Sequence, residues 1–255
     1  KCPLCGKLMA MIGLGSQRLE EELANKFPLA RVLRIDSDSM ASRDYYRLLK
    51  DFGEGQIDIL AGTQMLAKGL HFPNVTLVGI ISADTSLYLP DFRANERTFQ
   101  LISQVAGRAG RSEKKGVVFV QTFLPHQPAI QFAVGSDFDG FVKEELKHRK
   151  SCNLPPFWRL AVIVMRDGNF DKLDMACKQM RQRIDMIIGR EKLEANVRGP
   201  MPAVISRIQR FHRMQIIIQV PQAATVQKLF ACLRAAGPIR PAVKVAIDID
   251  PVNLL

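Results

Sequence analysis

The sequence predicts an α/β protein with two domains: a doubly wound parallel sheet over residues 8–150 and a small α+β domain over residues 151–255. Two observations predict this organisation. In the first part, short apolar segments alternate with helical ones, which is typical of a parallel sheet covered by helices on both faces. The stretch Asn153-Leu154-Pro155-Pro156 then stops any helix and marks a boundary, after which the segments follow a different order.

The spacing of apolar residues predicts each element of the first domain. Leu19, Leu23 and Phe27 recur every four residues, which predicts a helix. The apolar runs predict strands that are buried on both faces. The expected strands are Arg31–Asp36, Ile57–Ala61, Val75–Ser82 and Gly116–Thr122, and the expected helices are Ser16–Phe27, Ser42–Phe52, Arg93–Ala109 and Asp137–Lys150. Ligands of such sheets bind at the carboxyl ends of the strands, so the loops after Ala61 and Ser82 are expected to be functional.

The second domain follows the order β-α-β-β-α-β, which is that of a split βαβ, ferredoxin-like domain. The expected strands are Arg159–Met165, Asn196–Ser206, Arg213–Val220 and Val243–Ile249, and the expected helices are Asp171–Ile188 and Ala223–Ala235.

The charge of the chain narrows the class of partner. Lys and Arg number 36 against 25 Asp and Glu, which gives a formal net charge of +11. Such a surplus favours nucleic acid or an anionic membrane surface, although an ordinary basic enzyme would have the same composition. The sequence contains no apolar run of the ~20 residues that a membrane helix needs and no export signal, so we expect a cytoplasmic protein.

The stretch Gln104-Val105-Ala106-Gly107-Arg108-Ala109-Gly110-Arg111 is the most informative in the sequence. Arg108 and Arg111 are three residues apart at a helix end and share one face. Gly107 and Gly110 leave room for a neighbouring group to approach the backbone and the two arginines. The planar guanidinium group suits phosphate oxygens. The pair can therefore stabilise charge on a transferring phosphoryl group. The alternative is a solvated basic helix end.

This pattern, Gln-x-x-Gly-Arg-x-x-Arg, resembles motif VI of the superfamily 2 helicases, and the stretch from Gly62 to Val78 resembles their motif V. More narrowly, the chain is similar to the PriA (primosomal protein N-prime) helicases of replication restart. The segments Leu89-Pro90-Asp91-Phe92-Arg93-Ala94-Asn95-Glu96-Arg97 and Asp248-Ile249-Asp250-Pro251 are also close to that family, so the resemblance runs over nearly the whole chain.

The resemblance implies a RecA-like second helicase lobe in an ATP-dependent 3′-to-5′ DNA helicase that acts in replication restart and primosome assembly at stalled forks. It assigns completion of the ATP site to Arg108 and Arg111 and a DNA contact to Thr63. The nucleotide would also face Lys68, Gly69, Gln104 and Gly107. Without the resemblance, a hydroxyl and backbone N–H groups after a strand can bind phosphate, but an ordinary turn is the simpler interpretation of Gly62–Gly69.

The phosphate-cradling pattern Gly-x-x-x-x-Gly-Lys-Ser/Thr does not occur in the sequence. We therefore expect ATP with Mg²⁺ to be bound mainly by a first lobe outside this sequence. We also expect a truncated chain, a fragmentary gene or a split protein, inactive without that lobe. A rival interpretation is a non-catalytic DNA-binding or interaction protein that is complete as this chain. A weaker rival is another motor of the same superfamily, such as an RNA helicase.

Cys2-x-x-Cys5 has the spacing of half a tetrahedral zinc site, and by spacing alone two free thiols are equally consistent. The resemblance favours zinc, because PriA proteins carry a cysteine-rich zinc-binding insertion just before the second lobe. We therefore assign residues 1–7 to the end of that insertion and expect only a partial Zn²⁺ site.

Basic residues in the second domain suggest contact with nucleic acid. Arg207, Arg210 and Arg213 lie in a short span with His212, and basic side chains with aromatic neighbours suit a backbone and a stacked base. Two further candidate groups are Trp158 with Arg159, and Lys143, Lys147, Arg149 and Lys150. A solvated basic face is the alternative. The resemblance implies forked and single-stranded DNA, single-strand-binding protein and primosome proteins as partners.

Overall fold

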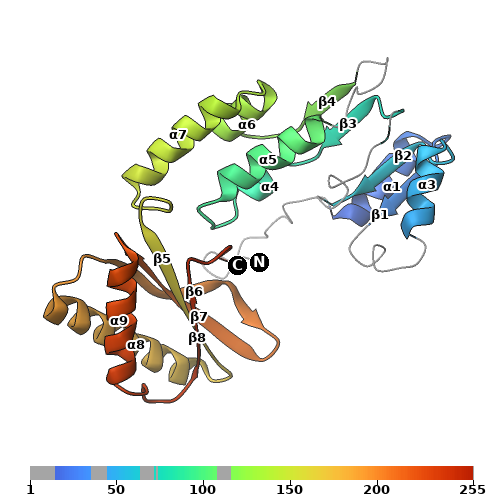
Figure 1. Ribbon diagram of the computed structural model, residues 1–255. Helices are drawn as coiled ribbons and strands as arrows, with labels where there is room; N and C mark the ends of the chain where they lie inside the picture. Colours follow the sequence, from blue (N-terminus) through green and yellow to red (C-terminus); the bar gives the residue numbers. More distant parts are fainter. Residues whose placement is uncertain (1–14, 36–44, 64–71, 73, 108–115, 255) are drawn as a thin grey trace. The chain divides into compact units, whose positions relative to one another are not determined.

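The computed structural model describes residues 15–35, 45–63, 72, 74–107 and 116–254 (Figure 1). The chain divides into two compact units. The N-terminal unit is Lys1–Tyr88 with Asn95–Phe138, and the C-terminal unit is Leu89–Ala94 with Asp139–Leu255. The C-terminal unit is thus larger than the domain expected over residues 151–255, because it also takes in the short segment Leu89–Ala94 and nearly all of helix α7 (Phe138–Ser151).

Parallel strand pairs form the N-terminal unit, as the alternation of elements predicts. β1 (Val32–Ile35) pairs with β2 (Ile59–Gly62), and β3 (Leu77–Ile80) pairs with β4 (Val117–Val120). The accompanying helices are α1 (Ser16–Lys26), α3 (Tyr45–Gly53), α4 (Asp84–Leu87), α5 (Ala94–Ala106) and α6 (Pro128–Val134). The described strands make two two-stranded sheets, not the single sheet that was predicted.

The prediction that these strands are buried on both faces is wrong for β3 and β4. Leu77 is 61% exposed and Phe119 is 65% exposed. Apolar composition predicts that a strand face is suited to burial, but it does not identify the layer that would cover it. In the described part of the N-terminal unit, alternate side chains of both strands remain open.

An ion pair joins the beginnings of β1 and β2. The Arg31 guanidinium donates from Nε to Asp58 Oδ2 and from Nη2 to Asp58 Oδ1, each at 2.9 Å, and the Arg31 backbone N–H also donates to Oδ2 at 2.8 Å. These hydrogen bonds stabilise the carboxylate and lower the pKa of Asp58 to about 2. Val32 and Ile59, the next residues, are partners in the strand register.

The C-terminal unit is built on a four-stranded antiparallel sheet in the order β6-β7-β5-β8. Along the chain its elements are β5 (Arg159–Asp167), α8 (Phe170–Glu191), β6 (Asn196–Ile208), β7 (Phe211–Val220), α9 (Ala223–Ala235) and β8 (Lys244–Ile249). The Asn169 side chain caps α8 by accepting from the Lys172 N–H at 2.9 Å. Helices α8 and α9 lie together on one face of the sheet (Figure 1).

The core lies between the sheet and these two helices. Alternate residues of β5, namely Ala161, Ile163 and Met165, pack against the apolar stripe of α8, and α9 adds Leu229 and Phe230. Because successive side chains of a strand point to opposite faces, Arg166 and its alternating neighbours face away from the helices. On this opposite face Arg166 is exposed, whereas Val162 is buried, so the face is open only toward the Arg166 end of β5.

Gly199 lies at an irregularity of β6, where the register with β7 shifts between Arg198 and Met201. Its φ is +95°, and a Cβ atom there would lie 2.6 Å from the carbonyl oxygen of Gln215. The Gly199 carbonyl also accepts a hydrogen bond from Arg181 Nη1. The position therefore requires glycine for both its conformation and its space.

We predict that Gly199→Ala lowers the free energy of unfolding by about 3 kcal/mol, because alanine combines an unfavourable φ with a backbone collision. Urea unfolding followed by circular dichroism measures the change. The matched control is Gly189→Ala on α8, where a Cβ meets nothing within 4 Å. That control should be neutral or stabilising by up to about 1 kcal/mol, and an equal loss in both variants would contradict the assignment.

We also predict that Arg31→Gln returns the pKa of Asp58 from about 2 toward the ordinary aspartate value of 3.8. Since the native pKa is depressed, the pair stabilises the fold above about pH 4 and loses its effect as the pH falls through about 2. A ¹³C carboxyl NMR titration measures it. Arg47→Gln, which removes the 4.0 Å pair with Asp51 on α3, is the control and should leave the pKa of Asp58 unchanged.

Candidate nucleic-acid interface

A row of cations crosses three adjacent strands on the face of the C-terminal sheet that carries no helix. Arg166 of β5 is the register partner of Arg213 on β7 and of Lys244 on β8. Neighbouring strands are about 4.8 Å apart, and like charges directly opposite one another destabilise a sheet. Such a row is unfavourable for the fold alone, and an anionic ligand would offset the repulsion.

The ring of Phe211 lies among these cations. Arg210 Cζ and Lys244 Nζ are each 5.4 Å from the ring centroid, and Arg166 Cζ is 5.7 Å from it. These distances allow cation–π attraction, worth about 0.5–1 kcal/mol each at an exposed site. We call Arg166, Arg210, Phe211, Arg213 and Lys244 the Phe211 cluster.

The charges of the Phe211 cluster have no acidic partner in the described part of the chain. Its four cations take part in none of the ion pairs there, and their one side-chain hydrogen bond among the described residues runs from Arg213 Nη1 to the Ile205 carbonyl at 3.2 Å. Arg166 and Arg210 are exposed. The cluster thus presents positive charge to solvent on a defined support, which suits a polyanion.

The structure brings together two of the three arginines that were predicted to bind DNA. Arg210 and Arg213 lie in the Phe211 cluster. Arg207 is exposed on β6 and pairs in register with His212, whose ring packs edge-on against Phe170 at 5.5 Å. Arg207 is thus separated from the cluster by the pleat, and His212 serves in packing.

Arg166, Phe211 and Lys244 were missed by sequence reasoning. Arg166 and Lys244 belong to strands that are distant in the sequence and become neighbours only through pairing. Phe211 did carry a signal, because it stands directly between Arg210 and His212.

The other basic candidates divide into exposed lysines and arginines that are paired with a carboxylate. Lys143, Lys147 and Lys150 are exposed on α7. Arg149 is buried, and its Nε donates to Glu145 Oε1 at 2.8 Å, so the expectation that it faces nucleic acid is wrong. Arg159 pairs with Asp250 at 2.8 Å.

Part of the predicted nucleotide and DNA site lies in the N-terminal unit. Thr63 directly follows β2 and is exposed at the carboxyl end of that strand. Gln104 is exposed near the end of α5, and the Gly107 N–H donates to the Ser103 carbonyl at 3.1 Å. The remaining predicted residues lie outside the described residues: Cys2, Cys5, Lys68, Gly69, Arg108 and Arg111.

Neither a metal-holding group nor a membrane-spanning helix occurs among the described residues. They contain no group of three or more His, Cys, Asp or Glu side chains arranged to hold a metal ion. The described helices also include none that is long and apolar enough to cross a membrane.

Comparison with known proteins gives two family matches. Residues 10–113 match the helicase conserved C-terminal domain, and residues 150–252 match the primosomal protein N C-terminal domain. A solved structure of a de novo designed protein, Foldit4, has a TM-score of 0.28 at 14% identity over 37% of this chain and 97% of its own, which is too low to define the fold.

Curated relatives match along the chain. The replication restart protein PriA of Bacillus subtilis is 41% identical over 230 residues, covering 89% of this chain and 28% of the relative. PriA of Treponema pallidum is 38% identical, and the match covers 100% of this chain and 38% of the relative. PriA of Haemophilus influenzae is also 38% identical, and the match covers 100% of this chain and 35% of the relative. The chain thus spans about a third of the length of these relatives. It corresponds to the C-terminal portion of the PriA replication restart proteins, with a helicase C-terminal domain followed by a primosomal protein N C-terminal domain.

Proposed function

We propose that the chain acts as the C-terminal part of an ATP-dependent DNA helicase that moves 3′ to 5′ and serves replication restart and primosome assembly at stalled forks. The match to PriA proteins along the whole chain carries this proposal. In it, residues 8–150 form the RecA-like second lobe and residues 151–255 form a split βαβ, ferredoxin-like domain. The antiparallel strand order β6-β7-β5-β8, with two helices on one face, supports the second assignment.

The arginines that follow α5 complete the ATP site in this proposal. Arg108 and Arg111 stabilise negative charge on the transferring phosphoryl oxygens, since a guanidinium group remains charged and forks toward two oxygens. Gln104 and Gly107 are exposed at the end of α5, as a nucleotide contact requires. Lys68 and Gly69, which follow β2 in the sequence, also face the nucleotide in this proposal. ATP and Mg²⁺ are held mainly by a first lobe, for which this sequence has no phosphate loop.

Cys2 and Cys5 would supply two thiolates to a structural zinc site. They lie outside the described residues, and no metal-holding group occurs among the described ones.

DNA contacts arise in both units. Thr63 faces the backbone of the DNA strand from the carboxyl end of β2. In the C-terminal unit, the Phe211 cluster and Arg207 bind phosphates. Because guanidinium and ammonium groups on a sheet face read charge and not base edges, this binding is independent of sequence.

Forked and single-stranded DNA are the proposed substrates, and single-strand-binding protein and primosome proteins are the proposed partners. Replication restart acts on the chromosome, so we place the protein in the cytoplasm.

A second candidate is a DNA-binding or interaction protein without catalysis. The observation that favours it is the Phe211 cluster, which needs no nucleotide to bind an anion. ATP hydrolysis distinguishes the two candidates.

We predict that Arg108→Ala and Arg111→Ala each lower DNA-stimulated ATP hydrolysis by at least about 1,000-fold, the lower end of the effect of an arginine finger. The test uses a chimera in which this chain replaces the matching C-terminal portion of the Bacillus subtilis relative. The Kd for DNA should change by less than about threefold. Arg47→Ala on α3, a surface arginine of the same unit, is the control. Unchanged turnover in both arginine variants would overturn the assignment.

We also predict that the double variant Arg166→Gln, Lys244→Gln binds DNA with a weaker salt dependence. The slope of log K against log salt should become shallower by roughly 0.9 for each duplex phosphate that the variant no longer neutralises, or roughly 0.7 for single strands. Fluorescence anisotropy at several salt concentrations measures it. Phe211→Leu removes the ring and should weaken binding about threefold.

The matched control is Arg190→Gln, because Arg190 pairs with Glu191 at 2.8 Å outside the cluster. Its slope should equal that of the unsubstituted chain. If the double variant also retains the original slope, the Phe211 cluster does not bind DNA.

A further inference from the structure

The last residues of the chain hold a short segment from the middle of the sequence. Arg93 Nη1 donates to the carbonyl of Pro251 at 2.8 Å and to that of Val252 at 2.9 Å. In return, the Leu254 N–H donates to Asp91 Oδ2 at 3.3 Å. The C-terminal tail, Pro251–Leu254, is therefore bonded in both directions to the segment Leu89–Ala94, within the C-terminal unit.

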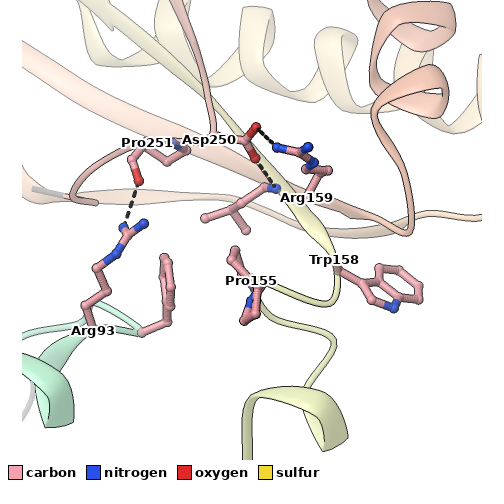
Figure 2. Close-up of a pocket in the computed structure, with 9 residues that line it drawn as sticks. Arg93, Pro155, Trp158, Arg159, Asp250 and Pro251 are labelled. Carbon is pink, nitrogen blue, oxygen red and sulfur yellow. Dashed lines mark hydrogen bonds and ion pairs between the residues drawn. The ribbon is translucent and has the colours of Figure 1, made fainter. Parts of the chain in front are cut away.

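The root of the tail is fixed to β5. The Asp250 N–H donates to the Leu160 carbonyl at 2.7 Å, and the Asp250 carboxylate accepts from Arg159 Nη1 at 2.8 Å (Figure 2). Asp250 has a φ of +52°, in the left-handed region that aspartate tolerates better than most residues. This turn redirects the chain from β8 into the tail, and Pro251 is buried.

Two arginine side chains also contact the aromatic ring of the segment. Arg93 Cζ lies 4.2 Å from the centroid of the Phe92 ring, and Arg149 Cζ of α7 lies 5.2 Å from it. Asp91 is only 6% exposed, and its Oδ1 accepts from the Arg93 N–H at 2.9 Å. The two oxygens of one buried carboxylate thus hold the segment and the tail together.

A cavity of about 340 Å³ borders these contacts (Figure 2). The segment contributes Phe92 and Arg93 to its lining, the turn before β5 contributes Pro155, and the end of the chain contributes Asp250 and Pro251. The hydrogen bonds of the tail therefore lie beside an open cavity in the C-terminal unit.

We propose that the C-terminal tail is a clasp that fixes the segment Leu89–Ala94 on the C-terminal unit and thereby sets the position from which α5 begins. Ala94 is both the last residue of the segment and the first residue of α5, and its N–H donates to the Asp91 carbonyl at 3.0 Å. The clasp therefore acts on the first residue of α5, which belongs to the C-terminal unit. Its effect on ATP hydrolysis rests on the function proposed above.

Hydrogen exchange on the chain itself tests the clasp. We compare the amides of Asp91 and Ala94, which donate to Leu89 and Asp91 carbonyls. In Arg93→Ala, and in a chain truncated after Asp250, both amides should exchange at least tenfold faster. The amides of Ile163 and Ile216 in the core should keep their rates, which shows that the unit remains folded.

The decisive comparison combines Arg93→Ala with the truncation after Asp250. If Arg93 acts through the tail, Arg93→Ala adds no further increase in the truncated chain, whereas independent effects multiply. Arg93→Lys retains a charged donor and should restore part of the protection. Arg190→Ala is the matched control for loss of a surface arginine and should change neither amide. Unchanged exchange at Asp91 and Ala94 after truncation would overturn the proposal, as would multiplying effects.

The chimera described above tests the consequence for catalysis. Arg93→Ala should reduce the stimulation of ATP hydrolysis at saturating DNA at least fivefold, whereas Arg190→Ala should leave it unchanged. Full stimulation in this variant would overturn the link to α5. If the unsubstituted chimera hydrolyses no ATP, the proposed function fails, and the exchange measurements still decide whether the clasp exists.

Discussion

The pleat of β5 and β7 is the constraint on which the C-terminal unit depends. One set of alternate residues, including Ile163 and Ile216, is fully buried beneath α8 and α9. That burial fixes the register, because a slip by one residue would move every buried side chain to the other face. The register in turn places Arg213, Arg166 and Lys244 side by side on the free face. The apolar core therefore determines the arrangement of the charges, and the cations are held close together despite their mutual repulsion.

Local patterns were sufficient to predict most elements of the C-terminal unit. Leu173, Met180 and Ile184 recur at helical spacing in α8, and every expected strand there exists. The charged site was predicted less well, because its members come from three strands. Arg210 and Arg213 are close in the sequence and were found, whereas Lys244 becomes their neighbour only after β8 pairs with β5. Pairing of distant segments depends on the whole core and leaves no signal in either segment alone.

In the N-terminal unit, prediction from the sequence is limited in a different way. Its parallel pairs follow from alternating apolar and helical segments, but burial of β3 and β4 on both faces does not follow from their composition. Leu77 and Phe119 are exposed in the described unit. A β-branched or aromatic run shows only that a face is suited to burial.

Arg149 of the C-terminal unit illustrates the same point for charge, since a basic residue on an amphipathic helix turns inward when Glu145 is available as a partner.

One edge strand connects the two functional proposals for the C-terminal unit. Among the described strands, β8 pairs only with β5, from Lys244 opposite Arg166 to Ile249 opposite Ala161, and all six of its residues are exposed. An edge strand held on one side is among the first parts of a sheet to open. In the proposed function, an anion bound at Lys244 would stabilise the paired state of β8 and, through Asp250 at the other end, the root of the tail. Linkage would make this coupling reciprocal, so that a tail held by Arg93 would also favour the proposed binding of an anion by these cations.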